Sequence, residues 1–263
     1  MKILLLINDL YRKNSGGGEL VYKNIIKNSP NIEFFYFRTS KIKNIDVPKN
    51  CHQIKLKNWR KFTLDSKNFN DFSFNYQKSI AANFAYSVSN LEFDFIELPD
   101  WNCFGSYLKE ELNKYNVKYK KLILALHGNI SDTLRFNDIN KSTLEKIKFL
   151  EINQIQAVDH IYGISYDYIK YWENKIQKKI HFFDPLQFLN LNQVFNNIEK
   201  KDSEKNKVAK PNIINIGRFE KRKGHEIFID TLNYLDQNIY DKTFIIGSGS
   251  KKYSVYLENI IKD

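Results

Sequence analysis

The sequence predicts a doubly wound α/β fold, in which helices cover both faces of a parallel sheet. Two observations predict this class: several of eight short strand-like runs are apolar at consecutive positions, as in strands buried on both faces, and helix-length amphipathic stretches lie between most of them. A third observation is composition. Hydrophobic residues make up 42% of the 263 residues and aromatic residues 15%, which suffices for a packed core.

The expected strands follow from these apolar runs in chain order. They are KILLLI at 2–7, IEFFYF at 32–37, DFIEL at 94–98, KLILAL at 121–126, HIYGI at 160–164, KIHFF at 179–183, NIINI at 212–216 and TFIIG at 243–247. The first run breaks at Asn8 and Asp9 and has no small-residue cleavage site after it. It is therefore read as a buried strand, because it is too short for a signal peptide or a membrane span.

The expected helices are the amphipathic stretches between these strands. They cover 19–28, 73–90, 102–115, 141–158, 165–176, 223–236 and 250–262. Ser165 and Ser250 are the expected N-caps of their helices, because a serine hydroxyl can accept a hydrogen bond from the first helical turn.

A change of composition divides the chain. Residues 190–210 are polar and charged and lack strand periodicity, and we interpret 199–210 as a linker. We therefore expect a first domain over 1–198 and a second over 211–263. The second supplies only two strands and two helices, which make a marginal core, so we expect this domain to be incomplete.

Charge and cysteine content limit the class of protein. The net charge of +11 suits anionic partners, but lysine, asparagine and isoleucine are abundant throughout, so only local clusters are informative. Cys51 and Cys103 have no CxxC spacing, which fits a reducing compartment. We expect a cytoplasmic protein, with peripheral contact at the inner face of an anionic membrane as its only membrane association.

Glycines follow the first strand. Gly16, Gly17 and Gly18 precede Glu19 and an apolar-periodic helix, and such a loop can bring backbone N–H groups close to an anion. The alternative is a flexible loop tip. A dinucleotide site is excluded, because no spaced third glycine follows and Arg38 stands where an acidic residue is needed. A Walker loop is excluded too, because the order of lysine and glycine is reversed at Lys223.

Polar residues also follow two central strands. His127 and Gly128 come after strand 121–126, and the imidazole can contact a sugar hydroxyl or phosphate there, or bond the backbone of its own loop. Glu97 and Asp100 flank a proline, and they suit either a paired-carboxylate hydrolase or, as we favour, a turn in which Asp100 caps helix 102–115. The histidines have no metal-like spacing with carboxylates or cysteines, so no metal site is expected.

The stretch IINIGRFEKRKGHE is unusual, because five of the seven residues after Gly217 are charged. Arg218 and Lys223 lie five apart around this turn, and an arginine fork with a lysine point charge suits a diphosphate. Gly224 would open the following helix to the same anion. The alternative is a solvated charged turn.

Together these motifs resemble the retaining GT-B glycosyltransferases of family four, the group 1 glycosyl transferases. The resemblance covers nearly the whole chain and rests on SGGGE, FIELPDW, ALHG, AVDHIYGIS, IINIGRFEKRKGHEIFIDTLNYL and FIIGSGS. It implies two Rossmann-like domains, an acceptor domain first and a donor domain second. It implies that Arg218 and Lys223 bind the donor diphosphate, that His127 contacts the transferred sugar, and that Gly16–Gly18 lie near donor and acceptor.

The resemblance further implies transfer of a sugar from a nucleotide-sugar to a glycan or lipid-linked hydroxyl acceptor, with retention and without a metal cofactor. Family members carry a downstream pair of glutamates that this sequence does not reach, so we expect a C-terminally truncated donor domain. A partner chain that supplies the missing half is one alternative, and a non-catalytic glycan- or partner-binding module is another. Specific nucleic-acid binding is not expected, because no recognition motif is present.

Overall fold

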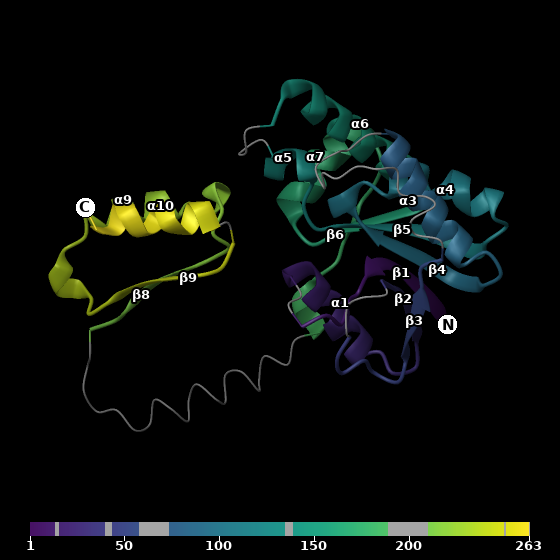
Figure 1. The fold of residues 1–263 in the computed structure, drawn as a ribbon, viewed down its shortest axis with the longest axis horizontal. Helices are drawn as coiled ribbons and strands as arrows, with labels where there is room; N and C mark the ends of the chain where they lie inside the picture. Colours follow the sequence, from purple (N-terminus) through teal and green to yellow (C-terminus); the bar gives the residue numbers. More distant parts are fainter. Residues whose placement is uncertain are drawn as a thin grey trace. The chain divides into compact units, whose positions relative to one another are not determined.

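The structure, a computed structural model, describes residues 1–13, 16–39, 44–57, 74–134, 139–188, 210–249 and 251–262. These residues form two compact units, which we call unit 1, up to 188, and unit 2, from 210 (Figure 1). The expected linker at 199–210 lies outside the described residues apart from Lys210, as does Ser250. The domain boundaries therefore stay predictions.

Unit 1 is built on a seven-stranded sheet in which all neighbouring strands are parallel. Its order is β3-β2-β1-β4-β5-β6-β7, with β1 Lys2–Asn8, β2 Glu33–Arg38, β3 Cys51–Lys55, β4 Glu92–Pro99, β5 Lys118–Leu126, β6 His160–Gly163 and β7 His181–Phe182. The chain runs outward from β1 in one direction and then from β4 in the other. The carboxyl ends of β1 and β4 thus flank the switch point, where ligands bind in open α/β sheets.

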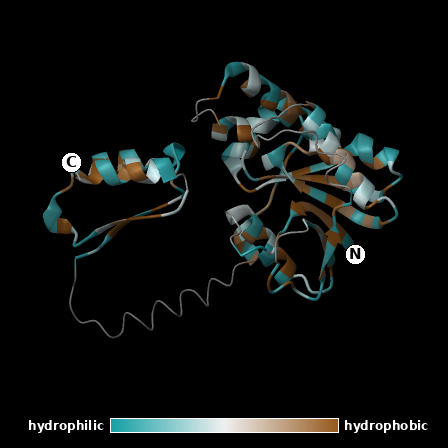
Figure 2. Cartoon of the chain, viewed as in Figure 1, coloured by the Kyte–Doolittle hydropathy of each residue, from teal (hydrophilic) through white to brown (hydrophobic). Residues whose placement is uncertain are grey.

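Helices cover both faces of this sheet, as predicted (Figure 1). They are α1 Gly17–Lys27, α3 Phe74–Ser87, α4 Gly105–Lys114, α5 Ile130–Leu134, α6 Lys141–Ala157 and α7 Tyr166–Ile176, with 3-10 turns at Asp100–Asn102 (η1) and Pro185–Phe188 (η2). Along β1, Leu5 packs with Tyr22 of α1, while Leu4 packs on the opposite side with Phe84 of α3. The strands are accordingly apolar at consecutive positions, and Figure 2 shows them as the most hydrophobic part of unit 1.

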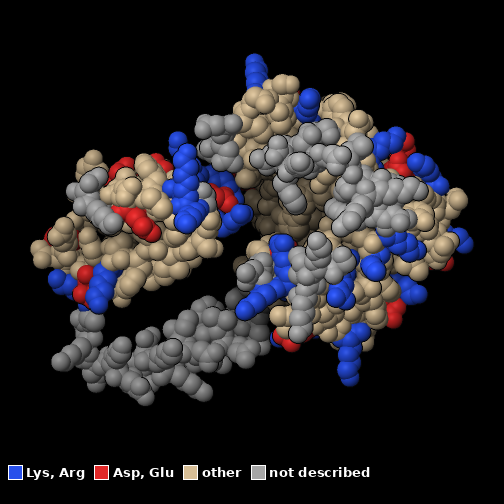
Figure 3. All heavy atoms as spheres, viewed as in Figure 1, with Lys and Arg blue, Asp and Glu red and all other residues tan. Residues whose placement is uncertain are grey.

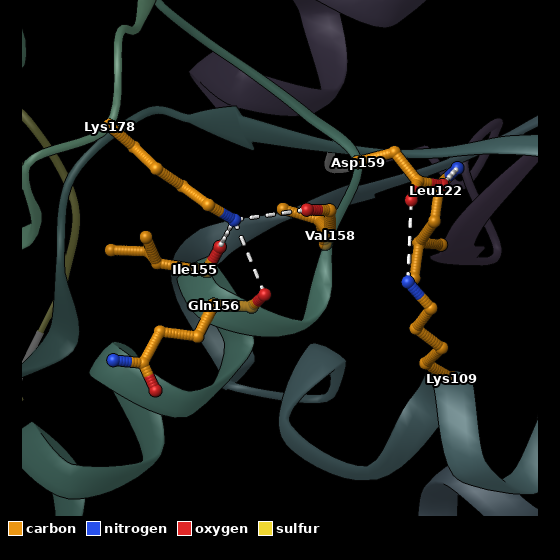
Figure 4. A network of polar contacts seen from close by, with 7 residues as sticks. All are labelled: Lys109, Leu122, Ile155, Gln156, Val158, Asp159 and Lys178. Atoms are coloured by element: carbon orange, nitrogen blue, oxygen red, sulfur yellow. Dashed lines mark hydrogen bonds and ion pairs between the residues drawn. The ribbon is translucent and has the colours of Figure 1, made fainter.

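A lysine side chain caps the C-terminus of α6, the longest described helix of unit 1. Figure 4 shows the Lys178 ammonium at the C-terminus of α6, where it donates to the carbonyl oxygens of Ile155, Gln156 and Val158 at 3.2, 3.3 and 3.2 Å. These carbonyls have no partner within the helix, and the cation also opposes the partial negative charge of the helix end. Asp159 then accepts a 2.8 Å bond from the Leu122 N–H, which aligns β5 with the start of β6.

Unit 2 contains two parallel strands, β8 Ile213–Ile216 and β9 Thr243–Ile246. Its helices, α9 His225–Leu232 and α10 Lys251–Lys262, lie on one side of the strands (Figure 1), with 3-10 turns at Lys221–Lys223 (η3) and Gln237–Ile239 (η4). The other side carries exposed apolar side chains, namely Ile214, Ile216, Phe244 and Ile246. A sheet with one covered face agrees with the small core expected from the sequence.

The structure corrects several expected ends of elements. Helix 102–115 begins only at Gly105, because the residues from Asp100 form a 3-10 turn first. Helix 223–236 is shorter at both ends, since η3 precedes it. Ser165 occupies the N-cap position of α7, but its side chain makes no capping hydrogen bond.

Candidate functional site

The predicted residues of unit 1 gather at the carboxyl edge of its sheet, on both sides of the switch point. The strand pairs align Leu5 with Glu97 and Pro99 with Ala125, so the segments that follow β1, β4 and β5 begin side by side. Figure 3, in the orientation of Figure 1, shows unit 1 hollowed over the end of β6 between α1 and α7. Lysine and arginine side chains stand on the rim of this hollow next to α1.

The glycine loop is fixed by its own neighbours. A Cβ atom at Gly18 would lie 2.3 Å from Cζ3 of Trp101, so only glycine allows this close packing. The Glu19 carboxylate accepts a bond from the Gly16 N–H and pairs at 2.7 Å with the Arg12 guanidinium. Glu19 thus holds the loop in place. Gly17 has no atom within 4 Å of an added Cβ and is the open position of the three glycines.

His127 lies between two aromatic rings. Its ring centroid is 5.6 Å from that of Tyr22 and 5.2 Å from that of Trp101, and its Nε2 is 3.5 Å from the Tyr22 hydroxyl. Within the described part of the chain, its buried Nδ1 has no hydrogen-bond partner. Burial lowers the pKa of His127 to about 4, so the imidazole is neutral at physiological pH.

Asp100 has a different role from the expected one. It does not cap a helix. Its buried carboxylate accepts the N–H groups of His127 and Gly128, at 3.0 and 3.1 Å, and the Tyr168 hydroxyl at 3.0 Å. Burial raises its pKa to about 6 in spite of these bonds. Gly128 has a φ of 149°, a conformation that favours glycine, so Asp100 and Gly128 together determine how His127 is presented.

Glu97 has a different hydrogen-bond partner from Asp100. It accepts a 2.6 Å hydrogen bond from the Tyr162 hydroxyl, and burial raises its pKa although hydrogen bonds from Tyr162 and Tyr22 lower it. The hydrogen-bond donors of the two carboxylates differ: Glu97 bonds Tyr162, whereas Asp100 bonds the loop after β5 and Tyr168. No sequence pattern marks Tyr22 and Tyr162 as site residues, because they occupy ordinary apolar positions of α1 and β6.

The charged turn of unit 2 follows the carboxyl end of β8. The Arg218 side chain is 72% exposed and pairs at 2.9 Å with Glu220, which also contacts Arg222 at 2.7 Å. Lys223 is exposed on the same turn, between Gly217 and Gly224. Both predicted cations are therefore accessible, and Glu220 offsets part of their charge.

A histidine that sequence reasoning missed holds this turn. His225 is fully buried; its Nε2 donates to the Arg218 carbonyl at 2.9 Å, and its Nδ1 lies 2.6 Å from the side-chain amide of Asn215. A Cβ atom at Gly247 would lie 1.9 Å from the Gly217 carbonyl oxygen, so the glycine of FIIGSGS allows the two loops to run side by side. Nothing in the charged sequence around His225 marks it as buried.

In the ranges that the structure describes, no three or more histidine, cysteine, aspartate or glutamate side chains are grouped to hold a metal ion. No described helix is long and apolar enough to cross a bilayer.

No family model matches the sequence, and no curated protein matches it. Among solved structures, the fold resembles that of a sucrose-phosphate synthase from Thermosynechococcus elongatus, with a TM-score of 0.68 and 11% sequence identity. The fold class predicted from the sequence, α/β of the GT-B type with parallel sheets, is confirmed. The match covers 99% of this chain and 66% of that one, so the chain spans about two thirds of the solved protein. At this identity the likeness establishes the fold alone.

Proposed function

We propose that this protein transfers a sugar from a nucleotide-diphosphate sugar to a hydroxyl group of a glycan or lipid-linked acceptor, with retention. The observation that carries the proposal is the exposed turn of Arg218 and Lys223 at the carboxyl end of a parallel strand, within a GT-B fold. Exposed cations in that position suit a ligand with two phosphates.

In this proposal the cations of unit 2 assist departure of the diphosphate. Arg218 and Lys223 would offset the negative charge that grows on the leaving group, and the glycines Gly217 and Gly224 would let it approach the backbone. Because side chains supply the positive charge, the proposal includes no metal cofactor. Arg218 would leave Glu220 to pair with the ligand, since a surface ion pair of this kind is weak.

In unit 1, His127 is the proposed contact for a sugar hydroxyl. A neutral imidazole suits a hydroxyl group, with which it can exchange a hydrogen bond, better than it suits an anion. Asp100 acts in this proposal through the backbone of His127 and Gly128, and Glu97 would lie nearer the acceptor.

Calorimetry with uridine and adenosine diphosphate tests the donor site. Arg218→Ala and Lys223→Ala should each weaken binding by about 1.5–3 kcal/mol, the range for hydrogen bonds to charged groups. The control is Lys242→Ala, which removes an exposed lysine elsewhere in unit 2. This variant should bind as tightly as the wild type does. Unchanged affinity in both site variants contradicts the proposal.

One observation favours a second candidate, a non-catalytic module that binds a glycan or a partner chain. The open side of the β8–β9 sheet is apolar, with Ile216 76% exposed, and such a surface suits a protein partner. Nucleoside diphosphate binding without sugar transfer in the presence of donors and acceptors would favour this candidate.

A further inference from the structure

Two aromatic rings are stacked and exposed at the carboxyl edge of unit 1. Tyr166 and Phe182 lie 3.9 Å apart between centroids, with 15° between their planes. The Tyr166 side chain is 68% exposed and Phe182 is 42% exposed. The pair therefore presents the outer face of the tyrosine ring to solvent, with the phenylalanine ring behind it.

The packing of β6 and β7 explains why this pair is exposed. Phe182 is in register with Gly163, which has no side chain to cover it, and Gly163 cannot be larger because an added Cβ would lie 2.7 Å from Ile169. The next residue, Phe183, faces the opposite side of the sheet and packs at 5.1 Å against Tyr162. Strand alternation thus leaves Phe183 half-buried against Tyr162 and exposes Phe182.

The strand register also locates the pair relative to His127. Leu126 pairs with Gly163, and Gly163 pairs with Phe182, so the three residues form a row across β5, β6 and β7. With neighbouring strands about 4.8 Å apart, the Cα atoms of Leu126 and Phe182 are separated by roughly 10 Å. His127 follows Leu126 directly. If one ring of an oligosaccharide is bound at His127, a second or third ring of the same chain can therefore contact Tyr166.

The surroundings of the pair suit a carbohydrate. Exposed polar residues follow Phe182 in the chain, namely Asp184 and Gln187. An aromatic ring carries partial negative charge on its face, and one face of a pyranose carries C–H groups of partial positive charge, so the two surfaces attract. Hydroxyl groups at the edge of the sugar can then bond to the polar neighbours.

We propose that Tyr166, supported by Phe182, is a stacking platform for a sugar ring of an oligosaccharide acceptor. This inference rests on the proposed transferase function and narrows its acceptor to a chain of at least two sugar rings. Tyr166 is the contact residue. Phe182 is a positioning residue, because its ring stacks on the tyrosine ring and fixes that ring's orientation.

Titrations followed by saturation-transfer NMR test the platform without any donor. The probes are maltotriose, cellotriose and triacetylchitotriose, each compared with its monosaccharide. At least one trisaccharide should bind the wild type about tenfold more tightly than its monosaccharide does. Tyr166→Ala and Tyr166→Leu should each lose about three- to tenfold in affinity, the effect of one aromatic contact, and Tyr166→Phe should keep wild-type affinity.

Two controls make the result specific. Tyr234→Ala removes a tyrosine that is 89% exposed in unit 2 and should change nothing. The melting temperature of each Tyr166 variant should equal that of the wild type, because the ring is mostly exposed.

The inference is overturned by any of three results: equal affinity for tri- and monosaccharides, wild-type affinity in Tyr166→Leu, or no binding of any trisaccharide. If nucleoside diphosphates still bind through Arg218 and Lys223, the platform fails while the proposed transferase function stands. If diphosphate binding is absent but trisaccharides bind at Tyr166, the non-catalytic glycan-binding module is favoured instead.

Discussion

At the residue scale, burial shifts the pKa values of two neighbouring residues, His127 and Asp100, in opposite directions. The pKa of His127 falls from 6.5 to about 4, and that of Asp100 rises from 3.8 to about 6. Between pH 4 and 6.5 the unfolded chain holds more protons at His127 than the folded protein does, so this residue makes stability rise with pH. At Asp100 the folded protein holds more protons, so stability falls as pH rises through the same window.

Because the two contributions oppose each other, a variant is needed to reveal them. His127→Phe keeps a ring between Tyr22 and Trp101 but removes the titration. The unfolding free energy of the wild type, relative to this variant, should increase by up to about 3 kcal/mol from pH 4 to pH 6.5. Urea unfolding followed by tryptophan fluorescence measures it. A difference that stays constant across this range would show that the His127 pKa is not lowered.

At the element scale, the N-terminus of α1 depends on a close contact with η1. Gly18 packs so tightly on Trp101 that no side chain fits between them. Trp101 in turn packs against the His127 ring. The start of a helix after β1 and the turn after β4 are thereby coupled across the switch point. A change at Gly18 consequently reaches the candidate site through the indole.

Gly18→Ala should therefore lower the unfolding free energy by about 1–3 kcal/mol, as overpacking does, and should alter the Trp101 fluorescence. Gly17→Ala is the matched control. It adds the same methyl group one residue earlier, where nothing lies within 4 Å, and should be neutral or slightly stabilising. If the two substitutions change the unfolding free energy equally, the contact between Gly18 and Trp101 does not contribute to stability.

At the scale of the whole molecule, the two units differ in how much they bury. Unit 1 contains large apolar clusters on both faces of its sheet. Across 210–249 and 251–261, His225 and Leu257 are the buried side chains. Burial of apolar area is the main favourable contribution to folding. The free energy of local unfolding should therefore be much lower in unit 2 than in unit 1.

Hydrogen exchange followed by mass spectrometry should detect this difference. Amides of β8 and β9 should exchange at least about 100-fold faster than those of β1, β4 and β5, because opening two strands with one covered face exposes little apolar area. Exchange in β1 and β5, which lie within one sheet, serves as the internal reference. Equal protection of β8 and β5 would contradict the prediction.

Sequence patterns predicted most elements, because a strand buried on both faces must be apolar at consecutive positions. They missed β3, an edge strand with the sequence CHQIK, in which Cys51 is the buried residue and no apolar run exists. They also missed α5, a helix of five residues that is too short for a periodic signal. Both misses occur where local burial is small, and so little hydrophobic pattern is imposed on the sequence.

The sequence by itself determined the α/β class, the carboxyl-edge location of His127, Gly128, Glu97 and Asp100, and the charged turn of unit 2, because each depends on residues near one another in the chain. Tertiary structure alone decided what those residues contact. Asp100 bonds the backbone of another loop, and His225 secures the charged turn from within. Burial and hydrogen-bond partners come from segments distant in sequence, so no local pattern encodes them.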